Sequence, residues 1–310
     1  MPNSNQLGFD IEDATQYLVM AGSHSYGTQT NESDIDVRGW AIPPKDFFLS
    51  HYKRFNQTDE GWSLKHFPWN NRVATRLGMS YHGLIQRKDE LVDCTIYNLQ
   101  KFVKLAVKCN PNIIELLFVD DEDILYMSEL GATLRMNRNL FLTARAYHTF
   151  TGYAVSQLKR LNNRRQDLLS LGVSKNRNLA RAKLEVEHGY DTKHASHLFR
   201  LLWQAQEILK KGTLTVKDKH RANLLRQIRT GSLKYDQLIK MVDNEIKNCD
   251  FLYRRIKSGN LKTILYKPDK DRIDELMVDI IREDFGEVGL SRCDYRDACE
   301  LANSLGKWED

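Results

Sequence analysis

The sequence predicts an α/β domain at the N-terminus followed by an all-helical domain, and two observations support this prediction. Short apolar runs with the alternation of strands are confined to roughly the first 130 residues. Beyond them the apolar residues recur with a helical period, and Pro268 is the only proline. We therefore expect two domains, over residues 1–130 and 131–310, which the chain length of 310 residues allows.

Three segments of the first domain are predicted as strands. Residues 17–21 form a short apolar run that ends in a Gly-Ser turn. Residues 34–41 and 91–97 alternate between apolar and polar side chains, as half-buried strands do. The polar faces of these two strands carry acids, which are Asp34, Asp36 and Asp93.

The other segments divide into one irregular stretch and a series of helices. Residues 50–88 mix aromatic, glycine and basic residues, and we expect an irregular excursion or a hairpin there. A helix is predicted over 99–109 and a further short element begins at 112. In the second domain, helical periods and glycines at helix ends predict helices over 138–169, 179–188, 192–211, 218–229, 234–258, 270–284 and 293–305.

The net charge of +5 hides an uneven distribution along the chain. Residues 131–235 contain 21 Lys and Arg but only 6 Asp and Glu, whereas the segments on either side are both net acidic. Such a local excess favours a polyanionic partner, either a nucleoside triphosphate (NTP) or a nucleic acid. The plainer alternative is a solvated basic helical surface.

Composition disfavours several classes of protein. No apolar run approaches the roughly 18–20 residues that cross a bilayer, so we expect no membrane association. The N-terminus is polar and acidic, unlike a signal peptide, and we expect a cytoplasmic protein. The five cysteines are odd in number and lack Cys-x-x-Cys spacing, which argues against a disulfide framework or a zinc ribbon.

The most informative stretch joins the Gly-Ser turn, Gly22-Ser23, to the acid pair Asp34-Ile35-Asp36. Residues two apart on a strand point the same way, so the two carboxylates lie side by side and are able to bridge a pair of metal ions. Such neighbouring acids repel each other unless cations intervene. The turn offers backbone N–H groups and a hydroxyl as a phosphate cradle. An exposed polar strand face is the alternative interpretation.

In this order and spacing, residues 17–39 resemble the shared motif of the DNA polymerase β-like nucleotidyltransferase superfamily. The wider chain is similar to one branch, the RlaP-type predicted nucleotidyltransferases of bacteria and phages that are associated with RNA repair. The matching segments are Arg38-Gly39, Asp93–Tyr97, Asn110-Pro111, Glu115-Leu116-Leu117, Gly152-Tyr153-Ala154 and Tyr190–Leu201. Residues 50–88 and the last fifty residues show no such similarity.

The resemblance implies a nucleotidyltransferase fold with a small mixed sheet, an NTP substrate such as ATP and two divalent ions, Mg²⁺ or Mn²⁺. It implies that Asp34 and Asp36 hold the ions and that a third carboxylate on a neighbouring strand completes the site. Asp93 has the right setting for this role, and Asp89 and Glu90 are rivals at the start of the same strand. The residues beside the acids are assigned to nucleotide contacts, and these residues are Gly22, Ser23 and Arg38.

The helix predicted over 192–211 carries a polar stripe of Lys193, His197, Arg200 and Gln204, at spacings that place them on one face. His194 lies about one turn away, near the stripe. For an arbitrary helix, a solvated basic face is the better interpretation. The resemblance instead favours binding of triphosphate oxygens, and the residues so assigned are Lys193, His194, His197 and Arg200. Upstream bases are assigned a purely electrostatic role, and they are Arg177, Arg181 and Lys183.

The resemblance implies transfer of a nucleoside monophosphate to an acceptor hydroxyl with release of pyrophosphate, at a site between the two domains. We expect the acceptor to be an RNA 3′ end, as in RNA repair or tRNA end processing, reached through the basic residues 131–235. One alternative is an enzyme that nucleotidylylates a protein or a small molecule. Another is an RNA-binding regulatory protein with an inactive site. The sequence predicts neither the NTP preference, nor templating, nor the oligomeric state.

Overall fold

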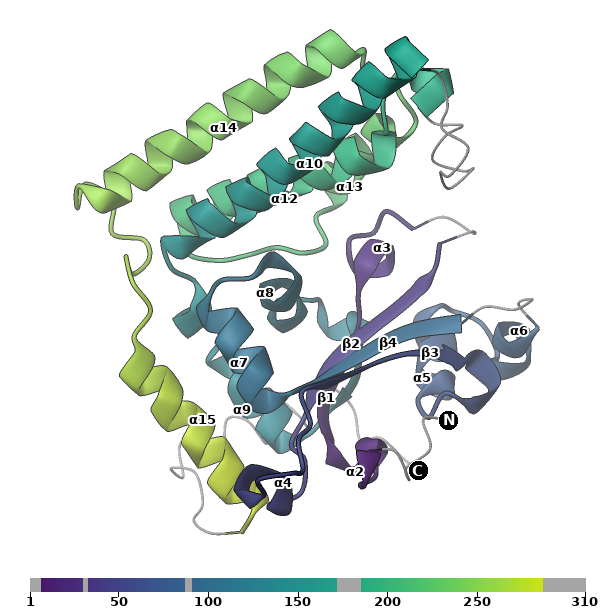
Figure 1. Cartoon of the computed structure of the whole chain (residues 1–310), viewed down its shortest axis with the longest axis vertical. Helices are drawn as coiled ribbons and strands as arrows, with labels where there is room; N and C mark the ends of the chain where they lie inside the picture. Colours follow the sequence, from purple (N-terminus) through teal and green to yellow (C-terminus); the bar gives the residue numbers. More distant parts are fainter. Residues whose placement is uncertain (1–6, 30–32, 87–90, 172–184, 287–310) are drawn as a thin grey trace. The chain divides into compact units, whose positions relative to one another are not determined.

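The computed structural model of the chain describes residues 7–29, 33–86, 91–171 and 185–286, which divide into two compact units (Figure 1). Unit 1 comprises Met1–Val107, Asn112–Phe141 and Asp269–Asp310, and unit 2 comprises Lys108–Pro111 and Leu142–Pro268. We describe each unit by itself. The functional domains expected over 1–130 and 131–310 stay a prediction, because packing alone defines these units.

Unit 1 is built on a five-stranded sheet of order β3-β4-β2-β1-β5. The strands are β1 (Thr15–Met20), β2 (Ile35–Ala41), β3 (Gln57–Ser63), β4 (Leu91–Asn98) and β5 (Ile124–Met127). Strands β2 and β4 run parallel, and the other neighbours run antiparallel. The prediction of an α/β part with a small mixed sheet and a helical C-terminal part is therefore confirmed.

Helices cover the sheet of unit 1 (Figure 1). They are α2 (Ile11–Ala14), α3 (Gly22–Ser25), α4 (Asp46–Leu49), α5 (Asn70–Arg76), α6 (Tyr81–Ile85), α7 (Leu99–Val107), α8 (Pro111–Leu117), α9 (Glu129–Met136) and α15 (Lys270–Asp284), with short 3-10 turns at Leu64–His66, Asp121–Asp123 and Arg138–Phe141. Helix α7 packs against β2 and β4, α9 packs against β1 and β5, and α15 packs against α7 and α9.

The two faces of the sheet differ in a way that positions the acids. Ile35 and Val37 of β2 join the apolar side chains of β4 in a buried cluster on one face. On the other face Trp40 is fully buried and packs near Phe102 of α7, with ring centroids 6.4 Å apart. Asp36 shares that second face of β2 by the two-residue period of a strand. Its end of the strand is half-buried, while the end at Trp40 is covered by α7.

Residues 50–88 are more regular than the sequence indicates. They contain β3, α5 and α6. Strand β3 pairs antiparallel with β4, but α5 and α6 separate the two strands in the sequence. The prediction of a local hairpin within this stretch is therefore wrong. The segment Gln-Thr-Asp-Glu-Gly-Trp-Ser has little strand propensity, and its conformation is decided by pairing with a distant strand. Strand β5 and helix α9 were likewise not predicted.

Unit 2 is helical. Its helices are α10 (Arg145–Leu171), α12 (Thr192–Lys211), α13 (Lys219–Arg229) and α14 (Tyr235–Lys257). Helix α12 packs against the other three. The prediction of a helix over 192–211 is confirmed at both ends, because Asp191 caps its start and Gly212 adopts a left-handed conformation at its end. Among the described helices, none combines the length and apolar character needed to cross a membrane.

The single helix predicted over 138–169 is interrupted before α10. The N–H of Ala144 donates to the carbonyl of Leu265 over 2.9 Å, and Thr143 forms an isolated parallel bridge with the same residue. This pairing with a distant segment replaces helical hydrogen bonds at Leu142–Ala144. Three sets of predictions lie outside the described residues: most of the helix over 179–188, the helix over 293–305, and Arg177, Arg181 and Lys183.

Candidate active site

The turn after β1 lies directly against Asp36. Gly22 has a φ of +61°, a left-handed conformation that favours glycine. A Cβ at this position would lie 2.2 Å from Oδ2 of Asp36 and 3.0 Å from its Cγ. The N–H of Ala21 also donates to the backbone carbonyl of Asp36 over 2.8 Å. Only glycine at position 22 therefore leaves the carboxylate where it is.

Strands β2 and β4 bring two of the predicted acids together. Asp36 and Asp93 are register partners on these parallel strands, so their side chains lie on the same face of the sheet. The side chain of Asp36 is 31% exposed and that of Asp93 is 60% exposed, so both reach solvent. Asp34 is exposed and lies just before β2, which begins at Ile35. The rivals Asp89 and Glu90 lie outside the described residues.

Arg38 bridges the two acids. Its Nη2 lies 2.9 Å from Oδ2 of Asp93 and 3.7 Å from Oδ1 of Asp36. Burial lowers the pKa of Arg38, but the hydrogen bond with Asp93 and the negative charges of Asp93 and Asp36 outweigh it, so the pKa is raised. The guanidinium thus offsets the mutual repulsion of the carboxylates. We predicted Arg38 as a nucleotide ligand, and here it contacts the acids.

The donor set of this cluster suits a hard divalent cation, because carboxylate oxygens are the ligands that Mg²⁺ and Mn²⁺ prefer. The Asp36 carboxylate occupies the space that a Cβ of residue 22 would need, so glycine at this position fixes where the carboxylate lies. Within the described ranges, however, no three His, Cys, Asp or Glu side chains converge to hold a metal ion. Arg38 lies between Asp36 and Asp93, so a shared ion requires the guanidinium to leave Asp93.

A contact that sequence reasoning missed anchors the turn. The hydroxyl of Tyr26, at the end of α3, donates to Oε2 of Glu115 on α8 over 2.7 Å. Glu115 is only 3% exposed, so this is a short hydrogen bond to a buried carboxylate. Tyr26 is not among the residues that the sequence predicts for the site. Its separation from Glu115 by 89 residues left no local pattern by which to find the pair.

The second group of predicted ligands lies on α12 in unit 2, where two of the four are buried and His197 is half-buried. Lys193 is exposed. His194 is 7% exposed, and its Nδ1 lies 2.8 Å from Oδ2 of Asp191. Arg200 is 6% exposed and donates to Nδ1 of His197 over 2.8 Å. The alternative of a solvated basic face therefore does not describe this stripe.

His197 is neutral at pH 7. Burial, and secondarily the charge of His194, lower the pKa of His197 to about 4. A neutral imidazole accepts the hydrogen bond from Arg200 but adds no positive charge for a phosphate to meet. Arg200 also donates to Oε1 of Gln204 over 3.2 Å, so two neighbouring side chains fix its guanidinium.

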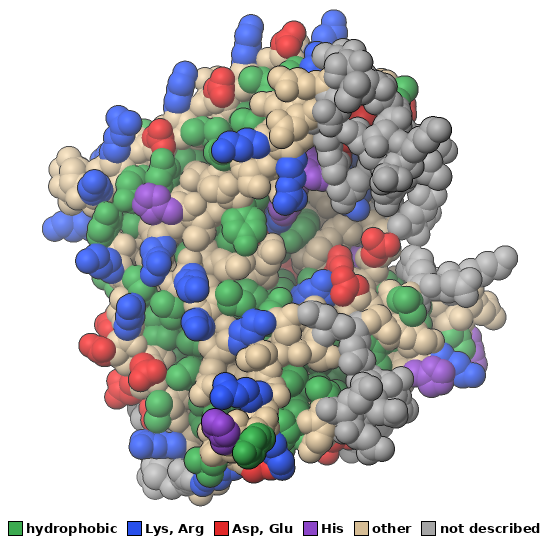
Figure 2. Space-filling model, viewed as in Figure 1, with side chains coloured by type: hydrophobic (Ala, Val, Ile, Leu, Met, Phe, Trp, Pro, Cys, Tyr) green, Lys and Arg blue, Asp and Glu red, His purple; other side chains and the backbone are tan. Residues whose placement is uncertain are grey.

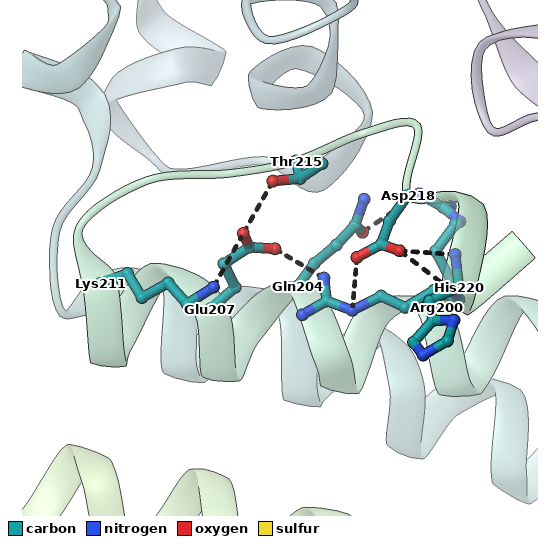
Figure 3. A network of polar contacts seen from close by, with 8 residues as sticks. Arg200, Gln204, Glu207, Lys211, Thr215, Asp218 and His220 are labelled. Carbon is teal, nitrogen blue, oxygen red and sulfur yellow. Dashed lines mark hydrogen bonds and ion pairs between the residues drawn. The ribbon is translucent and has the colours of Figure 1, made fainter.

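Further along α12 a polar network ties this helix to α13 and to the segment between them (Figure 3). Glu207, 5% exposed, accepts hydrogen bonds from Oγ1 of Thr215 over 2.8 Å and from Nη1 of Arg221 over 2.6 Å. Asp218 caps α13 and lies 3.6 Å from Nε of Arg221. The sequence indicates this network only through two acids, Glu207 and Asp218, within a basic segment. It supports α12 as a rigid element of unit 2.

The predicted residues thus form two clusters, one in each unit. Gly22, Asp36, Arg38 and Asp93 lie together in unit 1, with Ser23 in the adjoining turn and Asp34 at the start of β2. Lys193, His194, His197 and Arg200 follow one another along α12 in unit 2.

Comparison with known proteins gives one extensive match. The sequence profile described as RlaP, the RNA repair pathway DNA polymerase beta family, matches residues 12–279. A search of curated proteins finds no match. Among solved structures, a nucleotidyltransferase-like protein from Exiguobacterium sibiricum aligns over 98% of this chain and 87% of its own. That alignment has 10% identity and a TM-score of 0.27, a likeness too low to support an inference.

Proposed function

The chain belongs to the RNA repair pathway DNA polymerase beta family, and on this premise we propose that it is a metal-dependent nucleotidyltransferase acting on an RNA end. The reaction joins the α-phosphorus of an NTP to an acceptor hydroxyl, breaks the bond to the β-phosphate and releases pyrophosphate. The observation that carries the proposal is the register of Asp36 with Asp93 beside the Gly22 turn.

In this proposal the acids hold the catalytic ions. Asp34 and Asp36 would bind both Mg²⁺ or Mn²⁺ ions, and Asp93 would complete the ligands on the acceptor side. When bound, such ions lower the pKa of the attacking hydroxyl and neutralise charge on the phosphates. The absent side chain at Gly22 lets the Asp36 carboxylate lie directly against the turn, and Ser23 would supply a hydroxyl and an N–H to the phosphate oxygens.

Arg38 is proposed to exchange partners during this process. Asp36 and Asp93 would hold a divalent ion only if the guanidinium of Arg38 moved away from Asp93, because the two positive charges would repel each other. A phosphate of the bound nucleotide offers the same two-pronged arrangement of oxygens. Arg38 would therefore stabilise the free acids and would contact the nucleotide once ions were bound.

The residues of α12 are proposed to bind the triphosphate. Lys193 is the exposed cation and contacts phosphate oxygens as the charge on the leaving pyrophosphate grows. Arg200 adds a second positive charge, held in place by His197 and Gln204. His194 pairs with Asp191, and the neutral His197 orients Arg200 without adding charge of its own at pH 7.

The acceptor we favour is an RNA 3′ end, because residues 131–235 carry a large excess of positive charge. The test is incubation of the full chain with each α-³²P-labelled NTP, Mg²⁺ or Mn²⁺ and total RNA, followed by a denaturing gel. Label in RNA, absent with Asp34→Asn/Asp36→Asn, is the expected result. Label in protein bands would point to protein nucleotidylylation, and tight RNA binding without any label would favour a regulatory RNA-binding protein.

A further inference from the structure

Four aromatic side chains of unit 2 form a continuous group, which we call the tyrosine platform: Tyr147, His148, Tyr253 and Tyr266. The rings of Tyr147 and Tyr253 are stacked, with centroids 4.3 Å apart and 13° between their planes. The ring centroids of Tyr253 and Tyr266 lie 6.3 Å apart, with 29° between the ring planes. His148 packs edge-on against both Tyr147 and Tyr253, at 4.9 Å from each. The platform joins the start of α10, the end of α14 and the segment after it.

Hydrogen bonds between the polar groups fix the orientation of the rings. The hydroxyl of Tyr253 lies 3.0 Å from Nε2 of His148 and 3.1 Å from the hydroxyl of Tyr266. The hydroxyl of Tyr147 donates to the carboxylate of Asp250. Because the rings are already ordered, a ligand that stacks on them loses little side-chain freedom on binding.

One side of the platform is open to solvent, while Tyr147 and Tyr253 also pack against a small apolar cluster of unit 2 formed by Ala144, Leu209 and Ile256. Tyr266 is 43% exposed, His148 is exposed, and Tyr147 and Tyr253 are half-buried. Phe251, close by on α14, is 60% exposed. Aromatic rings packed for stability alone are normally buried, so ordered rings that face water indicate a surface that binds a partner.

Positive charge surrounds the platform. Residues 251–268 contain five Lys and Arg and no Asp or Glu, and the five are Arg254, Arg255, Lys257, Lys262 and Lys267. All five are exposed, as is Arg145 at the start of α10. Figure 2 shows Lys and Arg side chains gathered over the end of α14 and the segment that follows it. The nearby acid, Asp250, is already engaged by Tyr147.

We propose that the tyrosine platform and its surrounding bases form a binding surface for single-stranded RNA. Unpaired bases stack on the exposed rings, and the neighbouring Lys and Arg side chains pair with the phosphates. A duplex does not fit this chemistry, since its bases stack on one another and offer no free face. The assignment to RNA rests on the proposed function, in which this surface would hold the body of the acceptor strand.

The test is fluorescence anisotropy of a short labelled single-stranded RNA with the full chain, in EDTA and without NTP. Tyr266→Ala should weaken binding roughly 5- to 150-fold, the range for loss of one base-stacking contact. Tyr52→Ala is the matched control, because Tyr52 in unit 1 is 91% exposed and lies outside the platform, and it should bind like wild type. Melting temperatures equal to wild type would verify that the variants fold.

A charge variant provides an independent arm. Lys262→Ala/Lys267→Ala removes two exposed cations. The plot of log K against log salt should therefore become less steep, its negative slope decreasing in magnitude by about 1.4. Unchanged affinity and slope in this variant and in Tyr266→Ala would overturn the proposal. Tighter binding of duplex RNA or of single-stranded DNA than of single-stranded RNA would overturn it as well.

The same samples separate this inference from the proposed function. Binding is measured without metal or nucleotide, so Asp36→Asn should bind RNA as tightly as wild type. If wild type transfers label to RNA and Tyr266→Ala binds RNA with undiminished affinity, RNA binding by the tyrosine platform is refuted while the proposed nucleotidyl transfer is supported. Loss of affinity in Tyr266→Ala, with no transfer to RNA by wild type, would support the platform and refute RNA as the acceptor of the nucleotide.

Discussion

Replacing Gly22 by alanine adds one methyl group at the point where the Gly-Ser turn meets Asp36. The new Cβ would lie 2.2 Å from Oδ2, 3.0 Å from Cγ and 3.3 Å from Cβ of Asp36. Rotation of the carboxylate relieves the first contact but not the two that lie closer to the backbone. The turn or the base of the Asp36 side chain therefore has to move.

The expected cost has two parts, and a second glycine separates them. Alanine at a left-handed φ costs roughly 1–2 kcal/mol by itself. Gly78→Ala measures this part alone, because Gly78 has a φ of +67° and a Cβ there would meet nothing within 4 Å. Gly22→Ala adds a steric conflict of roughly 1–3 kcal/mol. We expect a total loss in the free energy of unfolding of about 2–5 kcal/mol for Gly22→Ala.

Both variants are to be compared by urea unfolding and by the rate of nucleotide transfer. Gly78→Ala should keep the wild-type rate, whereas Gly22→Ala should lose about 100-fold or more, since a shift of about 1 Å in a catalytic group has that effect. Equal stability and equal rates for the two alanine variants would refute the assigned contact between the turn and Asp36.

Three further predictions concern His197, Arg38 and Tyr26. His197 has a pKa of about 4 in the folded chain against an ordinary value of 6.5, so the unfolded chain takes up a proton first as the pH falls. Protonation of His197 in the unfolded chain should lower the free energy of unfolding by about 2 kcal/mol from pH 7 to pH 5. Urea titrations of His197→Asn at the two pH values should lack that loss. An equal loss in wild type and in the variant would contradict this prediction. Arg38→Ala leaves Asp36 and Asp93 without their bridging cation, so Mg²⁺ should raise its melting temperature more than that of wild type. An equal rise in both would count against the bridge. Tyr26→Phe removes the hydrogen bond to Glu115 and should cost roughly 1.5–3 kcal/mol in urea unfolding, whereas unchanged stability would show that the bond contributes nothing.

Local patterns predicted the elements that depend on local chemistry. The start and end of α12 follow from Asp191 as a cap and Gly212 as a left-handed terminator, both readable from residue type. The placement of Asp36 and Asp93 on open strand faces follows from the alternation of apolar residues around them. These features require no knowledge of what lies elsewhere in the fold.

Features set by distant contacts were not predictable in the same way. Strand β3 forms because β4 pairs with it, and the helix break at Leu142–Ala144 follows from pairing with Leu265. The salt bridges of Arg38 and the burial of Arg200 also depend on packing. The sequence shows the charge of such a residue, whereas its partner and its exposure come only from the folded chain.

The central claim is nucleotidyl transfer, and the fate of the individual phosphates tests it most directly. The full chain is incubated with RNA, Mg²⁺ and either α- or γ-³²P-labelled NTP, beside Asp34→Asn/Asp36→Asn. We predict that α label enters the RNA while γ label leaves as pyrophosphate, and that the double variant does neither. Entry of γ label into the acceptor would reveal phosphoryl transfer, and transfer undiminished in the double variant would place the chemistry elsewhere; either result contradicts the account.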